Sequence, residues 1–128
     1  MRILVDTHLL LWAATDPDRL PAVARTELEN MDNVLMFSAA SVWEVTIKNG
    51  LGRADFAVDA ALLRRGLLDN GYEELPVTGQ HAVQVGRLPP LHKDPFDRIL
   101  VAQSLVEGIA LLTSDALVAR YHASIRQV

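Results

Sequence analysis

The stretch HKDPFDRILVAQS, residues 92–104, predicts a loop that passes directly into an apolar helix. Asp94 stands at the N-cap position, where its side-chain oxygen can accept hydrogen bonds from the first-turn N–H groups. Pro95 follows at the first helical position, where its missing N–H and fixed φ suit a helix start. Residues at spacings of three and four form an apolar stripe that should face a core: Phe96, Ile99, Leu100, Gln103 and Val106. Asp97 lies off this stripe and near the positive end of the helix dipole, so its side chain should project from a rigid helix start.

Short apolar runs alternate with helical segments along the rest of the chain. The expected strands are 2–5, 34–37, 72–77 and 109–113, with 124–128 as a candidate edge strand. The expected helices are 9–13, 21–31, 41–48, 59–69, 80–88 and 116–121, together with the helix that starts at Pro95. No hairpin signal separates the strands. This alternation predicts an α/β fold with a mostly parallel sheet covered on both faces.

Length and composition predict one soluble domain, spanning residues 1–128. Half of the residues are hydrophobic and 22% are charged, which excludes a disordered chain. The chain lacks cysteine, so disulfides and cysteine-ligated metals are excluded. No run approaches the roughly 18 apolar residues of a membrane span and the first run is too short for a signal peptide, so we expect a cytoplasmic protein. The net charge of −4 means that a polyanionic substrate would need local basic groups, bound cations or a partner.

Four acidic residues from distant parts of the chain are expected at one edge of this sheet. Asp6 and Asp115 each end a strand, Asp97 begins a helix, and Glu44 lies on the helix after the second strand. Strand carboxyl ends and helix amino ends share one rim under right-handed crossovers, and this rim is where α/β sheets bind ligands. Taken singly, Asp6 and Asp115 could be helix caps, and Glu44 could pair with Lys48. Taken jointly, one acidic site explains all four better than separate caps and pairs.

Such a cluster needs cations, because two like charges about 4 Å apart repel by roughly 4 kcal/mol at an effective dielectric near 20. All-oxygen ligation suits Mg²⁺ or Mn²⁺. Two such ions about 4 Å apart can activate a water and stabilise the leaving oxygen in phosphodiester hydrolysis, with the acids as ligands. Thr7, Thr113 and Ser114 lie beside the acids, where their hydroxyls either orient the ligands or make local turn hydrogen bonds.

Other polar and aromatic residues receive no site role from the sequence. Four histidines lack metal-ligand spacing: His8, His81, His92 and His122. Arg98 could reach a phosphate beside Asp97, although a surface arginine is the simpler interpretation. Trp12 and Trp43 lie in leucine- and valine-rich helices, so we expect them to pack in the core rather than to stack on bases.

These motifs resemble those of PIN-domain ribonucleases, and more narrowly those of VapC-type toxins of type II toxin–antitoxin pairs. The resemblance rests on DT at 6–7 after an N-terminal strand, WE at 43–44, DPFDR at 94–98 and TSD at 113–115. Two longer segments, VDTHLLLW at 5–12 and SAASVWEV at 38–45, strengthen the resemblance. It covers essentially the whole chain, and four motifs in order at fitting separations make it specific.

The resemblance implies a three-layer α/β/α fold and an endoribonuclease that depends on Mg²⁺ or Mn²⁺. By position, the catalytic and metal-binding quartet would be Asp6, Glu44, Asp97 and Asp115, with Thr113 beside it. Asp94 keeps its role as a helix cap. An RNA substrate, a homodimer and a cognate antitoxin whose tail enters the site are also implied. An antitoxin arginine would suit such carboxylates.

Proteins with other functions share this topology. A phosphoacceptor receiver-like domain would need paired acids near the end of the first strand and a late lysine, whereas Asp6 lacks an acidic neighbour and no lysine follows Lys93. A haloacid-dehalogenase-type phosphatase would need an acid where His8 stands. A non-catalytic protein-interaction module stays open, and it would tolerate the loss of any single acid.

Overall fold

The computed structural model describes residues 1–52 and 57–128. Its strands are β1 (Arg2–Val5), β2 (Val34–Ser38), β3 (Glu73–Leu75), β4 (Ala110–Thr113) and β5 (Ile125–Gln127). They form a five-stranded sheet in the order β3-β2-β1-β4-β5, and each pair of neighbours runs parallel. The predicted parallel sheet is therefore confirmed, and β1 lies at its centre.

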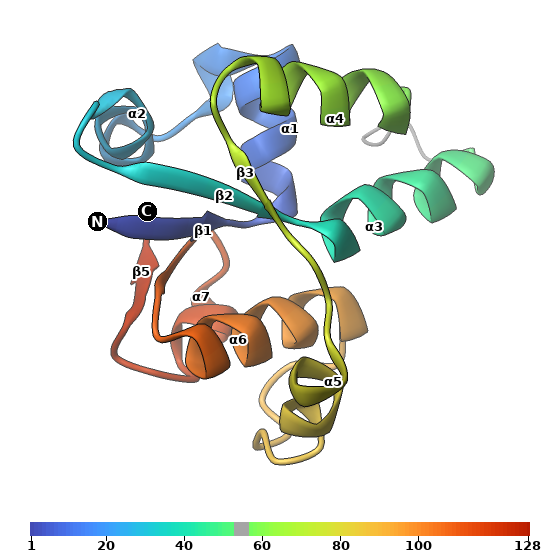
Figure 1. The fold of residues 1–128 in the computed structure, drawn as a ribbon, viewed down its shortest axis with the longest axis vertical. Helices are drawn as coiled ribbons and strands as arrows, with labels where there is room; N and C mark the ends of the chain where they lie inside the picture. The colour runs from blue at the N-terminus through green and yellow to red at the C-terminus, as the bar shows by residue number, and fades with distance from the viewer. Residues whose placement is uncertain (53–56) are drawn as a thin grey trace.

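Helices cover both faces of the sheet (Figure 1). They are α1 (Thr7–Thr15), the 3-10 helix η1 (Pro17–Arg19), α2 (Ala22–Glu29), α3 (Ala39–Gly50), α4 (Ala60–Asp69), α5 (Gly79–Val85), α6 (Pro95–Glu107) and α7 (Ala116–Ala119). Helices α1, α2 and α4 pack on one face, and α6 and α7 pack on the other, with α5 against α6. Helix α3 leaves the end of β2 and extends beyond the sheet (Figure 1). The three-layer α/β/α arrangement is confirmed.

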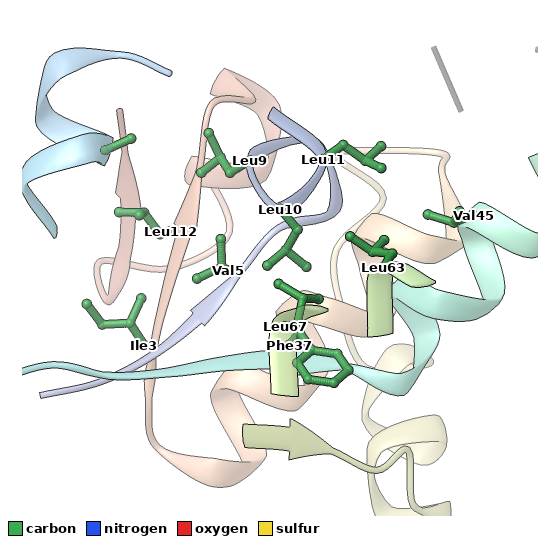
Figure 2. Packing of buried hydrophobic residues seen from close by; sticks show 11 residues of the cluster. Ile3, Val5, Leu9, Leu10, Leu11, Phe37, Val45, Leu63, Leu67 and Leu112 are labelled. Carbon is green, nitrogen blue, oxygen red and sulfur yellow. The ribbon is translucent and has the colours of Figure 1, made fainter. Parts of the chain in front are cut away.

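Alternation of side chains along the strands divides the core into two layers. Ile3 and Val5 of β1 face the side of α1 and α4, whereas Leu4 faces the side of α6. Figure 2 shows Leu10 of α1 and Leu67 of α4 among the packed side chains of the first layer. Because both faces are buried, the three central strands β1, β2 and β4 are nearly all apolar, whereas the edge strands β3 and β5 carry charged and polar residues.

Most element ends differ from the predicted ones by one to three residues, as at the predicted helix 80–88, which ends at Val85. Two of these differences have a clear local chemical reason. Helix α3 begins at Ala39, earlier than predicted, because Ser38 caps it by accepting a hydrogen bond from the N–H of Ala40 at 3.0 Å. Strand β3 ends at Leu75, short of the predicted residue 77, where Pro76 has no N–H to donate to a ladder.

The helices end and pack largely as their sequences suggest. The predicted left-handed cap after helix 59–69 is found at Gly71, whose φ is +85°, and Gly108 closes α6 in the same way. The predicted stripe of α6 is confirmed only in part. Leu100 and Gln103 are buried, but Phe96, Ile99 and Val106 are only half-buried, and Val101, Ala102 and Ser104 are buried in addition. The additional burial arises because α5 packs on α6. Among the described residues, no helix is both long and apolar enough to cross a membrane.

Candidate active site

The four predicted acids converge at the carboxyl edge of the sheet. Asp6 follows β1 and Asp115 follows β4, and these two strands are neighbours. Asp97 lies in the first turn of α6, and Glu44 lies on α3, which follows β2. Glu44 and Asp6 both lie close enough to Asp97 for their charges to raise its pKa. His92 contacts both Asp97 and Asp115, which joins the fourth acid to the group.

Asp6 is buried, and both of its carboxylate oxygens accept hydrogen bonds. Oδ1 accepts from the N–H of Leu9 at 3.0 Å, so Asp6 caps α1. Oδ2 accepts from the hydroxyl of Thr113 at 2.6 Å. Burial raises the pKa of Asp6, although the hydrogen bonds from Thr113 and Leu9 oppose this effect. Asp6 therefore caps a helix and also carries a buried carboxyl group that a cation would stabilise.

Glu44 is buried on α3, at 2% exposure. Its Oε2 lies 2.6 Å from Nζ of Lys48 one turn later. The ion pair that the sequence offers as an alternative role for Glu44 therefore does form. Nζ of Lys48 also lies 3.9 Å from Oδ2 of Asp94, so the lysine serves more than one carboxylate. Within the described part of the chain, the other oxygen of Glu44, Oε1, is buried without a hydrogen-bond partner. A buried carboxylate oxygen without a donor is costly for the fold, and cation ligation would offset that cost.

The surroundings of Asp97 oppose its negative charge. Burial is the main factor that raises the pKa of Asp97, and the negative charge of Asp94 is the next. The charges of Glu44 and Asp6 raise this pKa further, whereas His92 lowers it. Together they raise the pKa of Asp97 from 3.8 to about 7. Asp94 itself caps α6 as predicted, since its Oδ1 accepts from first-turn N–H groups at 2.8 and 3.3 Å. A perturbed carboxyl group of this kind, held among other acids, is typical of a functional site.

Asp115 is the most exposed of the four acids, and it is paired with a histidine. Its Oδ2 lies 3.0 Å from Nε2 of His92, while its Oδ1 accepts from first-turn N–H groups of α7. Partial burial raises the pKa of Asp115, but the hydrogen bonds from His92 and from the backbone lower it overall. Nε2 of His92 also lies 3.3 Å from Oδ2 of Asp97. These three residues offer ligand atoms that all lie within 4.8 Å of one another.

His92 is the residue of this cluster that the sequence analysis missed. The sequence spacing between His92 and the acids matches no metal-ligand motif. His92 lies beside Asp97 and Asp115 because the loop before α6 folds back toward them. The one available signal was its position in the stretch 92–104, five residues before Asp97.

The three hydroxyl residues predicted beside the acids have different partners. Thr113 donates to Asp6 and so orients a site carboxylate, as predicted. Ser114 acts on Asp6 through a backbone hydrogen bond. Thr7 donates to Oγ of Ser41 at 2.8 Å, and through this buried bond its hydroxyl ties α1 to α3. Thr113 is therefore the hydroxyl with a direct link to the acidic cluster.

The prediction that Trp43 packs in the core is wrong. It is 61% exposed and contacts Phe96 edge to face, with ring centroids 5.3 Å apart, because α3 extends beyond the sheet. Trp12 packs against the core, as predicted. Arg98 is not a free surface arginine, since it donates to the hydroxyl of Tyr121 and to backbone carbonyls around the loop before α6.

The donor set suits a hard divalent cation. The four acids offer carboxylate oxygens, the ligand type that Mg²⁺ and Mn²⁺ prefer. The lone Oε1 of Glu44 and the raised pKa of Asp97 indicate that neighbouring groups do not fully balance the negative charge. A divalent cation at this position would balance it and could polarise a phosphodiester.

Fold and site together place the chain in a class of α/β proteins that gather carboxylates at the carboxyl edge of a parallel sheet. A sequence model of the PIN domain family matches residues 3–123. The chain therefore belongs to the PIN domain family. A comparison with curated proteins found no match.

Solved structures of similar fold match nearly the whole chain. VapBC2 from Rickettsia felis, bound to a DNA fragment from its promoter, has a TM-score of 0.72 and 14% identity, covering 100% of this chain and 98% of that one. VapC20 from Mycobacterium tuberculosis, a toxin that cleaves the sarcin–ricin loop, has a TM-score of 0.68 and 19% identity, covering 98% of each chain. DNA-bound VapBC from Salmonella typhimurium has a TM-score of 0.68 and 14% identity, covering 100% and 97%. At these identities the likeness shows a shared fold.

Proposed function

We propose that this protein is a divalent-metal-dependent endoribonuclease and the toxin component of a type II toxin–antitoxin pair. The observation that carries the proposal is the convergence of Asp6, Glu44, Asp97 and Asp115 at one edge of the sheet. Membership of the PIN domain family and the likeness to VapC structures favour a nuclease site over a set of helix caps. In this proposal residues 1–128 act as one domain in the cytoplasm.

The proposed metal ligands are Asp6, Glu44, Asp97 and Asp115. They would hold Mg²⁺ or Mn²⁺, which supplies the activation of water and the stabilisation of the leaving oxygen. The surrounding residues set the geometry. Thr113 fixes the Asp6 carboxylate through its hydroxyl. Lys48 binds one oxygen of Glu44 and leaves Oε1 for ligation. The bound cation would also reduce the repulsion between an RNA phosphate and this acidic protein.

Cleavage of total cellular RNA by the purified protein tests the proposal. We expect cutting with Mg²⁺ or Mn²⁺, no cutting with EDTA, and no cutting by Asp6→Asn, Glu44→Gln or Asp97→Asn. Asp18→Asn changes an exposed acid of η1 and is the matched control, which should cut like the wild type. Circular dichroism checks that each variant is folded. Cutting that survives EDTA, or that persists in all three site variants, would contradict the proposal, and a folded protein that cuts nothing would favour an interaction module.

A cognate antitoxin is the proposed protein partner, since structures similar to this chain are VapBC complexes. The acidic site and the net charge of −4 favour an arginine in the inhibitory segment. An apolar groove of about 570 Å³ between α1, α2 and α4 could take an amphipathic helix of that partner. Leu62→Glu in this groove should weaken antitoxin binding in calorimetry, while Met31→Glu at an exposed position should not. Equal affinities would exclude the groove as the docking place.

A homodimer is the proposed assembly, formed through the apolar surface around Trp43. This surface encloses a volume of about 610 Å³ and is lined by Ala39, Ala40, Trp43, Val77, Ala82, Val85, Pro95, Phe96 and Ile99. An uncharged patch around an exposed aromatic residue is typical of the centre of a homodimer interface. Phe96 directly precedes Asp97, so such a dimer would bring two acidic sites near one interface.

A further inference from the structure

We propose that His92 is a positioning residue, which donates from its Nε2 to Asp115, contacts Asp97 with the same nitrogen, and is itself held by Arg98 and Tyr121. The inference rests on the proposed nuclease function and identifies a residue outside the acidic quartet on which that site depends. It is carried by the hydrogen bonds of one imidazole ring and of the loop that bears it.

The backbone around the ring determines which nitrogen carries the hydrogen. The N–H of Asp94 donates to Nδ1 of His92 at 3.0 Å. A backbone N–H can only donate, so Nδ1 must present its lone pair. The neutral imidazole then carries its hydrogen on Nε2, the atom that faces the acids.

Nε2 of His92 contacts two carboxylates from different helices. It donates to Oδ2 of Asp115 at 3.0 Å and lies 3.3 Å from Oδ2 of Asp97. Asp115 caps α7 and Asp97 lies in the first turn of α6, so the ring links the starts of both helices. Two carboxylates at this spacing repel each other, and a donor between them offsets that repulsion.

Direct ligation of a metal by His92 conflicts with this geometry. A metal would need a lone pair on Nε2, and a neutral ring that offers it must carry its hydrogen on Nδ1. A hydrogen on Nδ1 would point at the N–H of Asp94, so the 3.0 Å hydrogen bond from that N–H to Nδ1 would be lost. The ring is therefore arranged to donate to the ligands of a metal rather than to bind it.

The loop that carries His92 is fastened to both helices that the ring joins. The N–H of His92 donates to the hydroxyl of Tyr121, just beyond α7, at 2.8 Å. Arg98, in α6, donates to the same hydroxyl at 3.1 Å and to the carbonyl of His92 at 3.4 Å. It also donates to the carbonyl oxygens of Pro89 and Val85, at 3.1 and 3.0 Å. Backbone and ring of His92 are thus fixed relative to the two acids.

Nitrogen-15 NMR of the histidine rings at pH 8, without metal or RNA, tests the orientation of the ring. We expect His92 to show a hydrogen on Nε2 and none on Nδ1, with its signals assigned by their absence from His92→Gln. A neutral ring with the hydrogen on Nδ1 would overturn the inference. This measurement needs no nuclease activity, so its result stands whether or not the proposed function holds.

Calorimetric titration with Mn²⁺, compared with Mg²⁺, tests the positioning role. We expect His92→Ala to weaken binding of both ions by about tenfold or more. His92→Gln places an amide N–H near the position of Nε2 and should recover most of the loss, and His122→Ala, at an exposed histidine, should bind like the wild type. Tyr121→Phe, which removes the hydroxyl that holds the loop, should weaken binding less than His92→Ala does.

Two results would overturn the positioning role. Unchanged metal affinity in His92→Ala would show that the acids need no donor between them. A loss confined to Mn²⁺ and not rescued by His92→Gln would show that the imidazole is a direct ligand, since Mg²⁺ is a hard cation that takes oxygen ligands. A wild-type protein that binds neither ion and cuts no RNA would instead refute the proposed function. The NMR result would still decide, in that case, whether the His92 ring is oriented as proposed.

Discussion

The hydroxyl of Thr113 lies 2.6 Å from Oδ2 of Asp6, and this contact joins the ends of the neighbouring strands β4 and β1. The same hydroxyl oxygen accepts a hydrogen bond from the N–H of Asp115 at 3.0 Å. One fully buried side chain thus orients one acid of the candidate site and the backbone of another. The candidate site therefore depends on the register of β1 and β4.

Thr113→Val should destabilise the protein by about 1–3 kcal/mol, because it leaves a buried oxygen of Asp6 without its donor. The loss of this hydrogen bond should also raise the pKa of Asp6 further. Urea unfolding at neutral pH measures the change. Thr113→Ser keeps the hydroxyl and is the control, which should lose much less stability. A Thr113→Val variant as stable as the wild type would show that the hydroxyl of Thr113 contributes nothing to the fold.

Asp97→Asn should raise the free energy of unfolding at pH 8, by about 1–3 kcal/mol after allowance for the partial exposure of the side chain. The folded protein holds the Asp97 proton up to about pH 7, whereas an ordinary aspartate releases it near 3.8. The folded state therefore binds more protons between these values, and wild-type stability falls as pH rises through this window. In EDTA, the advantage of Asp97→Asn should shrink toward pH 4. An advantage that does not change with pH would contradict the raised pKa.

Lys48→Met should destabilise the protein by about 3–5 kcal/mol, because it leaves Glu44 buried without its cation. Adding Glu44→Gln to Lys48→Met should restore much of this loss, since the uncompensated charge disappears. A double-mutant cycle in urea measures the coupling between the two residues. Additive effects of the two substitutions would contradict a coupled ion pair.

Mg²⁺ or Mn²⁺ should stabilise the folded protein, by about 2.7 kcal/mol at a free concentration 100 times the dissociation constant. The gain should vanish in Asp97→Asn and persist in the control Asp18→Asn. Because the pKa of Asp97 is about 7, metal binding near neutral pH should also release protons, which calorimetry in two buffers detects. Equal stabilisation of Asp97→Asn would place the metal elsewhere.

Trp43→Glu should convert the proposed homodimer into monomers while leaving the fold intact, because the side chain is 61% exposed. Light scattering coupled to size exclusion measures the mass of the 14.1 kDa chain in solution. Leu117→Glu, at another exposed apolar position, is the control and should remain dimeric. A wild-type monomer, or a dimer that tolerates Trp43→Glu, would contradict the proposed interface.

Most of the fold could be predicted because its signals are local. Apolar runs that end at a polar residue mark the strands, and Asp94 with Pro95 marks a helix start that the structure confirms. The convergence of the acids followed from the same signals, because a parallel sheet brings its strand ends to one edge.

The rest depended on how the chain folds back on itself. His92 became part of the cluster because its loop turns toward α7, and no sequence spacing encodes that path. Trp43 looked like a core residue because its neighbours are apolar, but α3 extends past the sheet that would have covered it. In the same way, α6 is buried on more than one side because α5 packs on it, which its own periodicity could not reveal.

The place of β1 at the centre of the sheet also bears on how the protein is made. Asp6 is joined by its hydrogen bond to a residue 107 positions later in the chain. During translation, Asp6, Glu44 and Asp97 leave the ribosome before the segment that supplies Thr113 and Asp115, and contacts of such long sequence separation form late. A growing or broken chain that stops before residue 113 holds part of the acidic cluster without its completed geometry. If the cluster is the cutting site of a toxin, the strand order itself delays its activity until that segment has been added.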